Sequence, residues 1–447
     1  MVLKEKGERI SMPNQSIVAI EQPEKKYRVV GIIILVGLAC FMLGACGGVN
    51  NPATTQVATP LAQNNVPRVF LLDPAVLQQT KQALGHDTTL QASLQQLTQQ
   101  ADKLLSARTV SVVEKTQALP DIDKHDYLSL ADYYWPDPSK SDGLPYIQRD
   151  GQLNPEVNTI PDKSNYNKMA SSVRTLGFAY YFTGKEAYAA KAADFLRVWF
   201  LNKDTYMNPN LNHAQMIRGR DTGRSIGIID VRDFASIVDA IGLIQHSHSW
   251  TEQDQNGIER WFSQYLDWLL NSTPGKEEAA ASNNHGTWYD EQAASIALFV
   301  NKTDVARSII ETSETRRIQK QIQADGSQPQ ELKRTLSWHY STFNLDALFR
   351  LASLGDRVGI NLWNYTSPQG AGLRKALDYI VPAAQDPTKW TYQQISPIKP
   401  GELVDVLYRA AAHYHETSYL QTAQAILGNN ARTNLDNLIY GSDTSKQ

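Results

Sequence analysis

Cysteine is nearly absent from this chain of 447 residues: only Cys40 and Cys46 occur, both near the N-terminus. The rest of the sequence therefore has neither a disulfide framework nor a cysteine-ligated metal site. An excess of positive charge is missing too. The formal net charge of −3 excludes the overall basic surface that is typical of nucleic-acid-binding proteins, so no nucleic-acid partner is expected.

Motifs for nucleotides and metals are also missing. The sequence has no G-x-x-x-x-G-K-[ST] element, and the glycines of RGRDTGRSIG at 218–227 do not follow a strand pattern. The nine histidines include the close pairs His246/His248 and His413/His415, but neither pair has the HExxH spacing of a zinc site. We therefore expect no metal ion and no organic cofactor.

Alternating apolar and polar residues, which mark a half-buried strand, are scarce, whereas apolar residues spaced by three and four recur from about residue 74 onward. Paired helices joined by short turns, without a crisp sequence repeat, favour a ring of helical hairpins over a regular solenoid. We predict an all-α fold, an α/α toroid (an incomplete barrel of helical hairpins), as a single domain over residues 69–440. The predicted helical segments are Ala75–Leu105, Ala170–Phe182, Lys185–Leu201, Val231–Gln245, Thr251–Asn271, Thr287–Asn301, Thr303–Ile322, Arg334–Leu354, Gly372–Ile380, Glu402–His415 and Thr417–Leu427.

The apolar run at Val29–Cys46 follows a basic flank and ends in LGAC. This layout is typical of an export signal, and LGAC resembles a bacterial lipobox, which implies cleavage before Cys46 and lipid attachment to its thiol. An uncleaved membrane anchor is the alternative. We expect a signal at 1–46, a flexible tether at 47–68, and an exported, membrane-tethered protein at the periplasmic or outer cell surface.

Two long polar stretches, at 130–156 and 205–230, interrupt the helices. Loops of this length that are rich in aromatic and polar residues are usually functional, and in a toroid such loops converge at one end of the ring. The candidate ligand contacts within them are Tyr134, Trp135, Asn212, His213, Gln215 and Arg224.

Two further segments carry side chains that suit the chemistry of a carboxylate. ASNNHGTWYD at 281–290 holds Asn284 and His285, and QPQELKRTLSWHY at 328–340 holds Arg334, His339 and Tyr340. The proton on C5 of a uronic acid sugar lies beside a carboxylate, so its removal requires that this charge be neutralised by donors such as Asn, His or Arg. A Tyr or His can then take the proton, and a Tyr can donate one to the departing O4.

Other uses of the same region remain open. Asn284 can instead cap the helix expected from Thr287, and Trp288 can belong to the core. Glycoside hydrolysis would need two carboxylates in separate roles, and Asp290 or Glu291 could be one of them.

SNNHGTWYDEQAA, together with ELKRTLSWHYSTFNL, NPNLNHAQMIRGRDTGRSIGIID and YYWPDPSKSDGLPY, resembles the bacterial alginate lyase superfamily of α/α-toroid polysaccharide lyases. The likeness covers most of 130–348. It implies that Asn284 and His285 neutralise the substrate carboxylate, that Tyr340 is the acid and base, and that Arg334 is its partner. WHY at 338–340 replaces a YHNY-like run of the family, so His339 competes with Tyr340 for the role of base.

The sequence thus predicts a polysaccharide lyase that cleaves a uronate-containing chain by β-elimination, with alginate first and glucuronan or another polyuronate next. Trp288 and Tyr289 join the loop residues as expected substrate contacts. The alternatives are an α/α-toroid glycoside hydrolase and a non-catalytic glycan-binding lipoprotein. The expected partners are an anionic polysaccharide and, through the N-terminal lipid or anchor, a membrane. Nothing in the sequence indicates the oligomeric state.

Overall fold

The computed structural model describes residues 66–116 and 122–442, and these are predominantly helical. The predicted signal, with Cys46, and most of the predicted tether lie outside these residues. The α-helices in chain order are α1 Pro74–Ala83, α2 Thr88–Leu105, α3 Asp162–Thr183, α4 Glu186–Leu196, α5 Phe234–Ile244, α6 Glu252–Asn271, α7 Thr273–Ala280, α8 Asn284–Phe299, α9 Thr303–Ser313, α10 Gln319–Gln321, α11 Pro329–Leu332, α12 Ser337–Val358, α13 Leu373–Gln385, α14 Val404–Tyr414, α15 Thr417–Leu427 and α16 Asp436–Tyr440.

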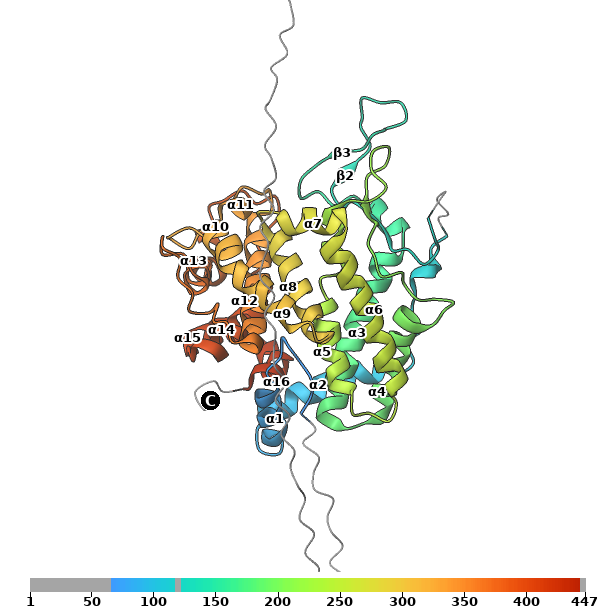
Figure 1. Cartoon of the computed structure of the whole chain (residues 1–447). Coiled ribbons are helices and arrows are strands. Elements are labelled where there is room, and N and C mark those ends of the chain that lie inside the picture. The colour runs from blue at the N-terminus through green and yellow to red at the C-terminus, as the bar shows by residue number, and fades with distance from the viewer. Residues whose placement is uncertain (1–65, 117–121, 443–447) are drawn as a thin grey trace, which may run out of the picture. The chain divides into compact units, whose positions relative to one another are not determined.

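Five helices form the inner wall of a ring. Helix α3 packs against α5, α5 against α8, α8 against α12, and α12 against α14. Outer helices cover this wall, with α4 on α3, α9 on α8, and α15 on α14. The first and last helices meet, since α16 packs against both α1 and α2 (Figure 1, blue beside red). The prediction of an all-α toroid is confirmed.

Most predicted helical segments coincide with observed helices, and the differences have local causes. The segment Ala75–Leu105 is two helices rather than one, because Asp87 accepts hydrogen bonds from the N–H groups of Thr89 and Leu90 and so starts α2. Helix α3 begins before the predicted Ala170 because its first turns are largely polar, so apolar periodicity does not reveal them. Within the described ranges, no helix combines the length and apolar character needed to cross a bilayer.

The segment 66–73 crosses one end of the ring. The backbone N–H groups of Phe70, Leu71 and Leu72 donate to the buried carboxylate of Asp239 on α5, at 2.6, 3.0 and 2.9 Å. Arg357 on α12 donates to the carbonyl oxygens of Phe70 and Leu72. Burial raises the pKa of Asp239 to about 7, although the three backbone donors oppose this rise. The segment therefore ties two inner helices together.

The two loops predicted to be functional lie at the other end of the ring (Figure 1). Strand β1, Leu128–Leu130, pairs in parallel with β4, His213–Met216, and so joins the two loops. Strands β2, Tyr134–Trp135, and β3, Ile147–Gln148, form an antiparallel hairpin within the first loop. Further backbone bonds, such as Tyr146 N–H to the carbonyl of Arg218, hold the loops side by side. This end carries the candidate site.

The contact between α5 and the crossing segment allows a test of the fold. A Cβ atom added at Gly242 would lie 2.0 Å from the carbonyl oxygen of Arg68, whereas one added at Gly85 would meet nothing within 4 Å. We expect Gly242→Ala to lower the free energy of unfolding by about 1–3 kcal/mol, the usual cost of overpacking. Gly85→Ala is the matched control and should leave it nearly unchanged. Denaturant unfolding measures both, and equal stability of the two variants would contradict the described contact.

Candidate active site

A cavity of about 360 Å³ opens where the two loops meet the N-terminal ends of α8 and α12. Eight of the residues predicted from the sequence line it together, although they come from four separate segments: Asn284, His285, Arg334, His339, Tyr340, Gln215, Arg224 and Tyr134. The structure thus brings all five candidate catalytic residues to one place.

Tyr340, in the first turn of α12, is 7% exposed. Its hydroxyl donates to the hydroxyl of Tyr133, at 2.9 Å. The guanidinium carbon of Arg334 lies 3.7 Å from the centre of the Tyr340 ring, a close cation–π contact. Burial raises the pKa of Tyr340 well above that of an ordinary tyrosine, and Tyr133 adds to the rise while Arg334 opposes it. At neutral pH the phenol is therefore protonated and can act as a proton donor.

Arg334 is held by Asp150, which follows β3 in the first loop. The Nε atom of Arg334 lies 3.1 Å from Oδ2 of Asp150, and its Nη2 atom lies 2.5 Å from Oδ1. The backbone N–H of Thr335 donates to the same carboxylate. Although burial raises the pKa of Asp150, the hydrogen bond from Arg334 and the one from Thr335 hold it below its usual value. The carboxylate therefore fixes the guanidinium against the tyrosine ring.

Asn284 is the first residue of α8 and is completely buried. Its backbone N–H and its side-chain Nδ2 both donate to Glu331 on α11, at 2.8 and 2.7 Å. Asn284 therefore does not cap the helix from Thr287, because the helix already begins at Asn284 itself. The Oδ1 atom of Asn284 has no hydrogen-bond partner among the described residues.

The neighbouring Asn283 belongs to the same cluster of polar residues in the sequence, but sequence analysis assigned it no separate role. It lines the same cavity and is partly exposed, and its side chain makes no hydrogen bond to the described part of the chain. Two consecutive Asn residues precede His285 in the sequence. That pattern does not show that the amide of Asn284 is buried and that of Asn283 is accessible.

His285 is oriented by a buried carboxylate. Its Nδ1 atom lies 2.7 Å from Oε1 of Glu278 on α7, a residue that is 1% exposed. Because a carboxylate accepts hydrogen bonds, this contact requires a proton on Nδ1 and leaves Nε2 as the ring nitrogen that is free to meet a ligand. His339 is more exposed: its Nδ1 lies 3.2 Å from Glu402, and its ring stacks on Phe343.

The loop residues of the cavity rest on a polar network. Arg224 donates to the backbone carbonyl and the side-chain oxygen of Gln215, and lies 5.0 Å from the centre of the Tyr134 ring. The side-chain amide of Gln215 donates to Asp230. Lys163 of α3 also pairs with Asp230, at 3.1 Å. Sequence reasoning missed five other residues that line the cavity, namely Asp132, Tyr133, Lys163, Asp230 and Arg232.

Several expected substrate contacts do not line this cavity, and for Trp288 and Tyr289 the prediction is wrong because they are buried. Trp288 is 1% exposed and packs on Phe343, and the hydroxyl of Tyr289 donates to the carbonyl of Leu269 inside the core. Both point inward because α8 is buried along nearly its whole length. Trp135, Asn212 and His213 also lie outside the lining of the cavity.

The carboxylates considered for hydrolysis are also placed away from the cavity. Asp290 is fully buried and accepts hydrogen bonds from Arg317, at 2.7 and 3.1 Å. Glu291 is fully buried as well, 3.6 Å from Arg350. Neither residue lines the cavity, so neither can reach a sugar there.

Comparisons with known proteins give the family and the fold. A sequence model of the alginate lyase family matches residues 111–390. The crystal structure of an alginate lyase from Bacteroides ovatus is similar with a TM-score of 0.81 and 36% identity, over 85% of this chain and 100% of that one. Alginate lyase A1-III from Sphingomonas species A1 has a TM-score of 0.52 at 18% identity, over 80% of this chain and 98% of that one, which shows the shared fold.

A search of curated protein sequences finds no match. The family match nevertheless spans more than half of the chain, and it includes every candidate catalytic residue of the cavity. On this evidence, together with the toroid and the arrangement of its cavity, the chain belongs to the alginate lyase family of polysaccharide lyases.

Proposed function

We propose that this enzyme cleaves a uronate-containing polysaccharide, alginate first, by β-elimination. The observation that carries the proposal is the convergence of amides, imidazoles, a guanidinium and a buried phenol on one cavity. The carboxylates beside four of these groups, Asp150, Glu278, Glu331 and Glu402, each contact one of them rather than forming an acid–base pair of their own. The family and the Bacteroides ovatus enzyme support alginate as the substrate.

In the proposed reaction the substrate carboxylate binds at the start of α8. His285 meets it as an imidazolium, with a proton on Nε2 as well as on Nδ1. The remaining amide N–H of Asn284 and the accessible amide of Asn283 join it. These donors reduce the charge beside C5 and stabilise the enolate-like intermediate that forms when the C5 proton leaves. Asn284 is held for this role by Glu331, and His285 by Glu278.

Tyr340 donates a proton to O4 as the glycosidic bond breaks. Its raised pKa keeps the phenol protonated at neutral pH, and Arg334 fixes its ring. The C5 proton passes to a neighbouring base of the same cavity, and His339 is the imidazole next to Tyr340. Bond cleavage leaves a 4,5-unsaturated sugar at the new non-reducing end, which absorbs ultraviolet light.

The defining test is a panel of polyuronates, comprising mannuronate-rich and guluronate-rich alginate and glucuronan, followed by the ultraviolet absorbance of the product. We expect absorbance to rise with at least one of them. New reducing ends without absorbance would indicate hydrolysis instead, and binding without either product would indicate a glycan-binding protein.

Removal of the phenol hydroxyl tests the proton donor. We expect Tyr340→Phe to lower kcat at least about 100-fold, because general acid catalysis contributes on the order of 10²–10⁴, and to change KM little. Tyr289→Phe is the matched control, since that hydroxyl bonds Leu269 away from the cavity, and it should remain active. Initial rates by absorbance measure both, and an active Tyr340→Phe enzyme would refute the assignment.

The buried partner of His285 gives a separate prediction. Glu278→Ala removes the acceptor that orients the imidazole, so we expect kcat to fall on the order of tenfold or more. Glu278→Gln keeps an acceptor oxygen at this position and should recover part of the loss. Glu277→Gln removes the same charge from the exposed neighbour of Glu278 and should match the wild type. Equal rates for Glu278→Ala and the wild type would show that the contact does not serve catalysis.

A further inference from the structure

A second cavity, of about 820 Å³, adjoins the catalytic cavity, and Arg232 lines both. On α3, Lys163 lines the first cavity, and Asn167, Ser171 and Arg174 line the second. These positions are three or four residues apart, so they share one face of the helix. The hollow therefore continues along the inner wall of the ring.

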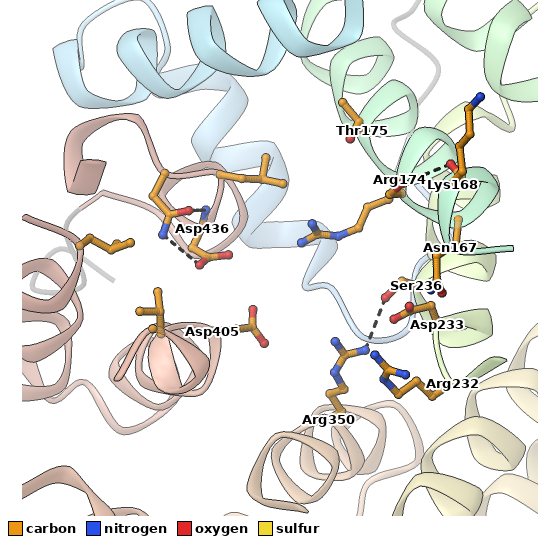
Figure 2. Close-up of a pocket in the computed structure, with 17 residues that line it drawn as sticks. Asn167, Lys168, Arg174, Thr175, Arg232, Asp233, Ser236, Arg350, Asp405 and Asp436 are labelled. Carbon is orange, nitrogen blue, oxygen red and sulfur yellow. Dashed lines mark hydrogen bonds between the residues drawn. The ribbon is translucent and has the colours of Figure 1, made fainter. Parts of the chain in front are cut away.

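Helix α12 shows the same continuation. Phe343 lines the catalytic cavity, and Arg350, two turns further along, lines the second one. On the opposite side the second cavity is bounded by α14 and by the start of α16, which contribute Asp405 and Asp436 (Figure 2). The residues of α3 at its rim, such as Lys168, are exposed, so the cavity opens to solvent between α3 and this C-terminal part.

Two arginines of the second cavity, Arg174 and Arg232, have guanidinium groups that make no hydrogen bond or salt bridge to the described residues. The guanidinium of Arg174 lies 5.5 Å from the centre of the Phe178 ring, and its charge acts on Asp405 and Asp436 without a direct contact. The guanidinium of Arg232 lies against two rings, 5.2 Å from the centre of Phe343 and 5.8 Å from that of Trp288. Arg350, by contrast, donates to Asp346 at 3.1 Å.

The carboxylates across the cavity from Arg174 already have partners. Asp405 lies 3.3 Å from Arg409 and accepts a hydrogen bond from the hydroxyl of Tyr440, and Asp436 accepts one from Asn434. Figure 2 shows Arg174 extending into the open space between the two sides. A guanidinium offers a planar pair of donors that matches a carboxylate. Arg174 and Arg232 are therefore suited to a carboxylate supplied by a ligand.

We propose that the second cavity binds further uronate units of the same polysaccharide chain whose scissile bond lies in the catalytic cavity. Arg174 and Arg232 pair with the carboxylates of those units. A polyuronate carries one carboxylate on each sugar. A chain with one carboxylate paired to Arg232 therefore presents the carboxylate of a further sugar to Arg174. This inference rests on the proposed function, and it adds an extended binding region that leads out between α3 and α14.

Oligouronates of increasing length test the proposal. For the wild type we expect kcat/KM to rise with length once the oligomer reaches the second cavity. Arg174→Gln should reduce kcat/KM for the longest oligomers roughly tenfold more than for the shortest, the effect of losing one charge-assisted contact. Arg307→Gln removes an exposed positive charge on the outer helix α9 and should keep the wild-type length dependence.

A second variant keeps the test valid if Arg174→Gln does not fold. Ser171→Trp places a bulky ring at an exposed position of α3 that lines the cavity, without removing a charge, and should give the same length-selective loss. Wild-type length dependence in both variants would overturn the proposal while leaving the proposed function intact. Loss of product inhibition alone would assign the cavity to a separate product molecule and would also overturn it. If the wild type released no unsaturated product from any oligomer, the proposed function itself would fail.

Discussion

The ion pair between Asp150 and Arg334 is the constraint on which the catalytic cavity depends. It joins the long first loop to the turn that precedes α12, two segments separated by 184 positions in the sequence. The same guanidinium lies against the ring of Tyr340, whose hydroxyl bonds Tyr133 in that loop. One arginine therefore contacts both the loop and the proposed proton donor.

The other polar groups of the catalytic cavity are also held by carboxylates. Glu331 bonds Asn284, Glu278 bonds His285, and Glu402 lies beside His339. Glu278 and Glu331 are buried, where a carboxylate without donors would be costly. These acids thus orient neutral or basic groups toward the ligand. The arrangement suits a reaction in which the substrate itself supplies the carboxylate.

The ring of helices explains why one cavity leads into another. Helices α3 and α12 each line both cavities, and residues one or two turns apart on them line successive parts of the hollow. The segment 66–73 crosses the other end of the ring and is bonded to α5 and α12. A ligand that extends beyond the catalytic cavity therefore has room toward the gap between α3 and α14, on the side where the cavity is open.

The sequence by itself determined the helical ring and the local groups of the site. Apolar spacing revealed most helices, and short motifs placed Asn284 beside His285 and Arg334 near Tyr340, because these relations lie within a few residues of one another. Only the tertiary structure decided which side chains hold these catalytic groups in position. Glu278, Glu331, Tyr133 and Asp150 gain their roles from contacts between separate elements, and burial of α8 removed Trp288 and Tyr289 from the cavity. Periodicity identifies the face of a helix that is apolar, but not which neighbour will cover it.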